Sequence, residues 1–307
     1  MIRRTFPRRP GACEASRAMG YSGRYHAASL AAVFIALAVG ILIGIGLADD
    51  VVSSASQELE SSLRSDLSAA EDRADDLQSQ LDRSARFSSQ IVPEVLAGKL
   101  VGRRVALVEI GGTDEELVAD ARDAIETADG ELAAVAQIAL PPDEQALIDD
   151  LPQRYAKLRR DPDALTKIGE AVGRELAGGG PTIRRLAPDL FARFSGDLRG
   201  VDDVVIARIP PDELSAGARA ATERFETGIL DGAATAPADD VGAELTSTDP
   251  STLGPFIDAG IPTVDHLDLP AGAIGLVYAL DGFEGNFGVK EEASGLLPDF
   301  GRGAGSP

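Results

Sequence analysis

The pattern of apolar and polar positions divides the chain into three parts. Residues 27–48 form an uncharged run of 22 residues, which as a helix would extend about 33 Å, enough to cross the hydrocarbon core of a bilayer. Six arginines and one glutamate precede it within residues 1–26, and the chain after it carries a net charge of −26. Because positive charge stays on the cytoplasmic side, this pattern predicts a basic cytoplasmic arm (1–26), a single transmembrane helix (27–48) and an extracytoplasmic remainder in a cell membrane.

A cleavable signal peptide is the alternative interpretation of the apolar run. Gly46 and Ala48 are small residues at the spacing of a cleavage site. Secretory apolar regions, however, are only about 7 to 15 residues long. The length of the run therefore favours a retained membrane anchor.

Small residues recur along the predicted anchor at every fourth position. They include Ala32, Ala36, Gly40 and Gly44, and the last two form a GxxxG motif. Such a ladder lets a second helix approach one face closely, which indicates helix pairing in the membrane. A segment this rich in small residues also produces a ladder by chance, so both interpretations stay open.

Residues 50–92 have the pattern of a coiled-coil stalk. Glycine and proline are absent from 57–86, and apolar residues step by 4, 3, 4, 3 and 4 positions along it: Leu63, Leu67, Ala70, Ala74, Leu77 and Leu81. This heptad spacing predicts a helix that associates with a second copy of itself, ending at Pro93. A lone amphipathic helix that lies on the following domain is the alternative.

Residues 99–298 alternate between strand and helix patterns. Apolar runs predict strands at 104–110, 132–140, 204–209 and 273–280, with a weaker candidate around Val241. Helices are predicted between them, including one at 165–176, one at 182–194, one at 213–230 and one at 251–259. Thr113 and Glu116 have the spacing of a capping box for the helix after the first strand. The predicted fold class is α/β, a doubly wound and mostly parallel sheet, followed by a disordered tail (299–307).

Composition excludes several classes of function. A net charge of −21 repels phosphate backbones, so the chain is not expected to bind nucleic acid. A single cysteine cannot form an intramolecular disulfide or a thiolate zinc cluster. Gly111 and Gly112 lie where α/β folds bind phosphate, but neither GxGxxG nor a P-loop is present and acidic residues surround them. We therefore expect a turn and no cofactor.

One polar cluster, Asp265-His266-Leu267-Asp268, could orient a general base or donate ligands to a metal. Neither use has its remaining partners in the sequence, so a solvated loop histidine is favoured and no catalytic or metal residue is assigned.

Five segments together resemble a known family: GRYH (23–26), SLAAVFIALAVG (29–40), KLVGRRVALV (99–108), VDHLD (264–268) and GNFGVK (285–290). The chain resembles the actinobacterial copper-transporter family named for the copper transport protein MctB. The resemblance implies an envelope protein linked to copper efflux and tolerance, in a family described as channel-forming in the outer membrane. It also makes the VDHLD segment a signature of the fold rather than a site.

The residues themselves favour an indirect role in copper homeostasis. Copper(I) prefers thiolate and thioether ligands, then imidazole, and residues 49–307 contain only His266 among these. The alternative function is a non-enzymatic coiled-coil scaffold or regulator of envelope assembly that binds a membrane partner. Asn286 and Lys290, in a loop after the last predicted strand, are the candidate partner contacts.

Overall fold

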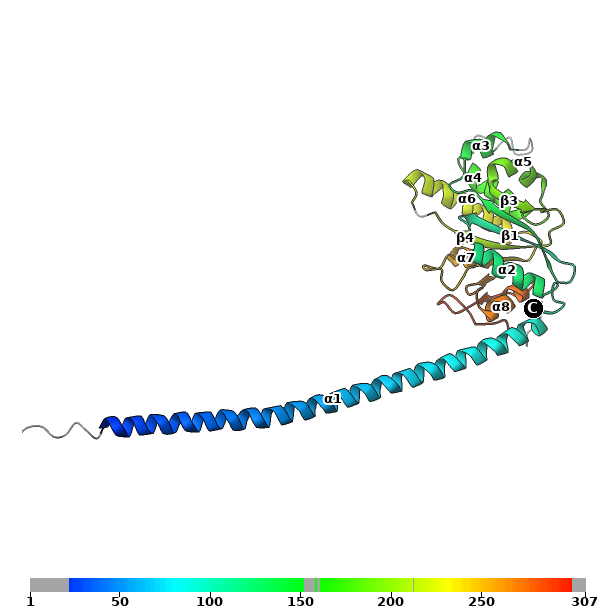
Figure 1. Ribbon diagram of the computed structural model, residues 1–307. Coiled ribbons are helices and arrows are strands. Elements are labelled where there is room, and N and C mark those ends of the chain that lie inside the picture. The colour runs from blue at the N-terminus through cyan, green and yellow to red at the C-terminus, as the bar shows by residue number, and fades with distance from the viewer. Residues whose placement is uncertain (1–21, 152–157, 159–160, 212, 300–307) are drawn as a thin grey trace, which may run out of the picture. The chain divides into compact units, whose positions relative to one another are not determined.

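The computed structural model describes residues 22–151, 158, 161–211 and 213–299 (Figure 1). The chain forms two compact units, of which the first ends at Leu81 and the second begins at Asp82. Most of the predicted arm and all of the predicted tail except Asp299 lie outside the described residues.

One helix, α1 (Ser22–Leu96), contains both predicted helical segments without a break. It continues past Pro93, which corrects the predicted end by three residues. Proline removes one backbone donor, yet its own carbonyl still accepts a hydrogen bond from Ala97 N at 2.9 Å. Within α1, the segment Tyr25–Ile45 is long and apolar enough to cross a membrane, by length and composition.

The second unit is built on a mostly parallel sheet with the strand order β3-β2-β1-β4-β5-β6-β7. Every neighbouring pair is parallel except β2 and β3. The strands are β1 (Arg104–Gly111), β2 (Glu131–Ile138), β3 (Phe191–Gly196), β4 (Asp203–Ile209), β5 (Asp240–Ala243), β6 (Thr263–Val264) and β7 (Asn286–Phe287). The order reverses between β1 and β4, as in doubly wound folds.

Helices cover both faces of this sheet, and each face has its own apolar core. Val108 of β1 packs into the first core and Leu107 into the second. On the first face lie α3 (Glu144–Asp149), α4 (Ala164–Glu175), α5 (Pro181–Leu190), α6 (Ala216–Ala234) and α7 (Gly254–Ala259). On the second lie α2 (Glu115–Thr127), α8 (Pro270–Leu280) and the end of α1 (Figure 1). The predicted α/β class and mostly parallel sheet are thus confirmed.

Helices α4 and α6 cross with their backbones in direct contact. Two glycines on each helix, Gly169 and Gly173 on α4 and Gly228 and Gly232 on α6, make the contact. A Cβ atom on Gly173 would overlap the carbonyl oxygen of Ile229 and lie 2.8 Å from Ala233 N. The close approach therefore requires glycine, and it brings the two helices together over the first face of the sheet.

Two element assignments made from sequence are wrong. The run at 273–280 forms most of helix α8 rather than a strand. Its residues are buried on nearly all sides, so the period that distinguishes helix from strand is hidden, and Pro270 in its first turn marks a helix start. The predicted helix 182–194 ends at Leu190, and β3 begins at Phe191.

Two predicted caps also differ. The cap of α2 is Asp114, one residue after Thr113, and its carboxylate accepts hydrogen bonds from Glu116 N (3.0 Å) and Leu117 N (3.1 Å). The helix predicted from Ser251 begins at Gly254, and the Ser251 hydroxyl instead accepts from Leu253 N at 3.3 Å. The weak strand candidate around Val241 is confirmed as β5.

A buried carboxyl group lies at the first residue of β5. Asp240 is 6% exposed, and neither of its carboxyl oxygens receives a hydrogen bond from a described residue. Burial, with Asp203 and Asp239 adding repulsion, raises the pKa of Asp240 from 3.8 to about 8. Between these two pH values the folded chain keeps a proton that the unfolded chain releases. Stability contributed by this group therefore falls as the pH rises from about 4 to about 8.

We expect Asp240→Asn to remove this pH dependence. As the pH rises from 5 to 8, the parent should lose stability relative to the variant, by about 1 kcal/mol of unfolding free energy per pH unit. Urea unfolding of the full chain in detergent at several pH values measures it. Asp258→Asn, at an exposed position of α7, is the control. A difference for Asp240→Asn that does not change with pH would contradict the assignment.

Candidate functional site

At the reversal of strand order, the end of β1 contacts the end of β4 directly. Gly112 N donates a hydrogen bond to Ile209 O at 2.8 Å, joining the end of β1 to the end of β4. Gly111 has φ +99°, and a Cβ atom on Gly112 would lie 2.6 Å from Ile209 Cγ2. The two glycines therefore allow a tight turn against the end of β4, as the sequence indicates.

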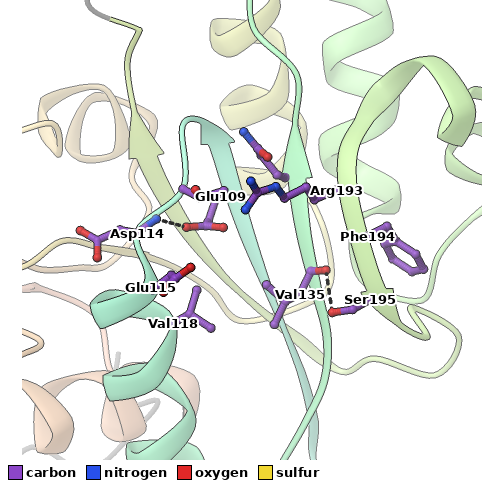
Figure 2. A pocket seen from close by; sticks show the side chains of 10 residues that line it. Glu109, Asp114, Glu115, Val118, Val135, Arg193, Phe194 and Ser195 are labelled. Carbon is purple, nitrogen blue, oxygen red and sulfur yellow. Dashed lines mark hydrogen bonds between the residues drawn. The ribbon is translucent and has the colours of Figure 1, made fainter.

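An acidic cleft of about 380 Å³ lies beside this turn, at the carboxyl ends of β1 and β2 (Figure 2). Its wall includes the start of α2 on one side and strand β3 on the other. Three of the residues that line it are acidic, namely Glu109, Asp114 and Glu115, although the Asp114 carboxylate itself caps α2. The other lining residues are Thr113, Val118, Val135, Gln137, Arg193, Phe194 and Ser195. Its acidic residues outnumber its one basic residue, Arg193.

Glu109 is the buried member of this cleft, at 3% exposure. Its Oε1 accepts a hydrogen bond from Asp114 N at 2.5 Å, which helps to start α2. Burial raises the pKa of Glu109, an effect that the Asp114 N–H and the positive charge of Arg193 oppose. Arg193 points from β3 toward Glu109 in Figure 2. The glutamate thus has a structural bond on one oxygen and lies at the wall of the cleft.

An apolar groove of about 560 Å³ lies on the other face of β3. Ile183, Ala187 and Pro188 of α5 line it together with Phe191 and Phe194. The two rings stack with centroids 5.4 Å apart, although residues three apart on a regular strand point to opposite faces. The pairing register with β2 shifts between Gln137 and Ile138, and this irregularity in β3 brings both phenylalanine rings to one face.

Within the Asp265–Asp268 segment the first three residues are buried, whereas Asp268 is exposed and accepts a hydrogen bond from Thr246 N at 2.7 Å. His266 is fully buried, so the prediction of a solvated histidine is wrong. Its Nδ1 lies 3.3 Å from Asp265 Oδ1, outside hydrogen-bond geometry, and its Nε2 has no polar partner among the described residues. Burial lowers the pKa of His266, against the opposing effect of Asp265, so the ring is neutral at pH 7. A metal ion in solvent cannot reach it.

Asn286 and Lys290, the candidate partner contacts, make bonds inside the chain. Lys290 Nζ donates to Glu244 Oε1 (2.7 Å), Leu245 O (3.1 Å) and Thr248 O (2.6 Å). Asn286 Oδ1 accepts from the Thr263 hydroxyl at 3.1 Å. The Lys290 bonds hold the segment after β7 to the segment after β5, and the Asn286 bond joins the first residues of β6 and β7. A partner contact there stays a prediction.

The predicted pairing faces of α1 are exposed. Leu63, Leu67, Leu77 and Leu81 are between 59% and 64% exposed, and nothing approaches within 4 Å of a Cβ atom built on Gly40 or Gly44. Ala32, Ala36, Ala70 and Ala74 are exposed as well. Pairing with a second copy also stays a prediction.

Among the described residues, no group of three or more histidine, cysteine, aspartate or glutamate side chains is placed to hold a metal ion. The acidic residues around the glycine turn include Glu109, Asp114 and Glu115, but their spacing in the sequence does not indicate a cleft. Its far wall is β3, which the sequence pattern did not indicate. A glutamate within the apolar run of β1 was the available signal.

The class is therefore an α/β protein with, among the described residues, one candidate membrane-spanning helix. The family model of the copper transport outer membrane protein MctB matches residues 21–189, more than half of the chain, and the chain belongs to this family. A comparison with curated protein sequences finds no match. Family membership supports a role related to copper transport in the cell envelope.

Proposed function

We propose that this MctB-family chain is a single-pass membrane protein with its α/β domain outside the cytoplasm. The support is the order of charges: arginines before the apolar segment Tyr25–Ile45 and a net charge of −26 after residue 48. Basic flanks stay on the cytoplasmic side, so residues 49–307 are exported. The same segment anchors the chain.

We further propose that the anchored chains associate through α1. The observation that carries this proposal is the exposed heptad seam, Leu63 to Leu81, on the same helix as the candidate span. Four exposed leucines on one face need a partner in water, and a second copy in the same membrane presents the same face in parallel. Gly40 and Gly44, earlier on this helix, allow close approach within the bilayer.

The role in copper handling is then indirect and non-enzymatic. Copper(I) requires soft ligands that can be reached, and the sole histidine after residue 48 is buried at 0% exposure. The acidic cleft offers only hard carboxylates. The protein would act by holding its domain, as an assembly, beside the components that move copper.

A second candidate function is a scaffold of envelope assembly with no part in copper handling. The exposed seam supports the scaffold as well as it supports a role in copper handling, since a self-associating chain could serve in both. Co-purification from native membranes distinguishes the two by the process in which the recovered partner acts.

Equilibrium dialysis of the full chain in detergent against copper(I) and copper(II) tests the indirect role. We expect no binding tighter than about 1 μM that survives Cys13→Ser, because Cys13 is the one thiol in the chain. Stoichiometric, tighter binding that persists in Cys13→Ser would contradict the proposal and assign copper to the chain directly.

A further inference from the structure

The edge strand β3 is open to solvent along its outer side. It pairs with β2 on one side and ends the sheet on the other, and residues 192–196 are all exposed. Exposed edges with unpaired backbone groups pair readily with another strand, and proteins commonly cover or shorten them. Among the described residues of this domain, no strand pairs with the outer edge of β3.

The hydrogen bonds of β3 fix which of its backbone groups face outward. Asp197 N donates to Ala133 O at 3.0 Å, just beyond the strand. In an antiparallel pair, residues whose backbone groups bond to the neighbouring strand alternate with residues whose backbone groups point away from it. Because Asp197 bonds to β2, the backbone groups of Ser195, two residues earlier, also face β2. The N–H and C=O groups of Phe194 therefore point away from the sheet, available to a further strand.

The two clefts of the site lie on opposite faces of this edge. On the α2 face, Glu109, Asp114 and Glu115 line the acidic cleft, and Arg193 and Ser195 project toward it (Figure 2). On the α5 face, the Phe191–Phe194 pair and the side chains of Ile183 and Pro188 line the apolar groove. Phe194 borders both clefts and is 49% exposed.

A strand added beside β3 would place its successive side chains alternately over these two clefts. We propose that β3 is a docking edge for an extended segment of a partner protein in which basic and apolar side chains alternate. The basic side chains lie over the acidic cleft and the apolar ones over the aromatic groove. Main-chain hydrogen bonds to Phe194 fix the register, as in other cases of strand addition.

Charge complementarity selects a basic segment over an acidic one. Three acidic residues, Glu109, Asp114 and Glu115, line the cleft against one basic residue, Arg193, and the chain after residue 48 has a net charge of −26. Such a surface attracts cationic segments and repels acidic ones at long range. This docking edge is independent of copper and of self-association through α1.

Synthetic peptides test the proposal on the full chain in detergent. A short peptide that alternates lysine and valine should bind, and one that alternates glutamate and valine should not. Methylating alternate backbone nitrogens along one edge of the lysine–valine peptide should weaken its binding at least about tenfold. The charges and side chains stay, but the methylated edge can no longer pair with β3. The Phe194 amide should become protected from hydrogen exchange on binding, while Ser195, already facing β2, should change little.

Variants of the chain separate the two clefts. Phe194→Ala should weaken binding about tenfold by removing the aromatic anchor. Glu115→Gln should weaken it less and reduce its dependence on salt. Leu296→Ala, which removes an apolar side chain of the same 49% exposure near the β7 edge, should leave binding unchanged. Failure of the lysine–valine peptide to bind, or binding that is indifferent to N-methylation, would overturn the proposal.

Discussion

Replacing Gly173 by alanine is expected to destabilise the α/β domain by about 3 kcal/mol, a large part of a typical domain's net stability. The added Cβ atom would overlap Ile229 O, a backbone atom of α6 that no rotamer change can move. The helices α4 and α6 would have to separate and open the core that they share with the sheet. Urea unfolding of the full chain in detergent, followed by circular dichroism, measures the loss.

Gly217 supplies the matched control within the same pair of helices. It lies exposed in the first turn of α6, and a Cβ atom added there would have no neighbour within 4 Å. Alanine favours helix over glycine by up to about 1 kcal/mol, so Gly217→Ala should be neutral or stabilising. If Gly173→Ala were as stable as Gly217→Ala, the close crossing of α4 and α6 would be wrong.

A single charge in the α1 seam is expected to turn the associated chain into a monomer. Leu67→Glu would bring two carboxylates together at the centre of the proposed pair, where burial of unpaired charge is strongly unfavourable. We expect association to weaken by at least about 100-fold, with the α/β domain unaffected. Sedimentation equilibrium of the full chain in density-matched detergent measures it.

Ser65→Glu adds the same charge two residues earlier, outside the seam, on the exposed surface of α1. It should leave association unchanged, which separates the effect of position from that of charge. A parent chain that is monomeric at all concentrations, or a Leu67→Glu variant that associates as the parent does, would contradict self-association through this face.

Local pattern sufficed for the elements whose burial leaves a clear signal. The strands β1, β2 and β4 are short apolar runs bounded by turns, and the candidate membrane span is too long and apolar to be mistaken for a strand. Prediction from the local pattern failed for elements that are buried on nearly all sides or exposed along most of their length. Helix α8 is apolar on nearly every side, and β3 is exposed along most of its length.

The candidate site depends on contacts that sequence spacing does not contain. The acidic cleft needs Arg193 and Phe194 on an antiparallel edge strand to face residues that precede them by about eighty positions. The polar residues around His266 are typical of a solvated loop. In the fold, however, Gly272 of α8 lies directly against the His266 backbone, and the histidine is fully buried. The glycines of α4 and α6 gave the same GxxxG signal as the anchor, but their pairing was visible only in the fold.

Membrane topology tests the central claim most directly, because every proposed role requires one anchor and an exported domain. Tags fused at the two ends of the full chain, with external protease added to intact spheroplasts, report which end is outside. The account predicts digestion of the tag after Pro307 and protection of the tag before Met1, with the protein in the membrane fraction. Protection of the tag after Pro307, or recovery of the intact chain in the cytosolic fraction, would contradict it.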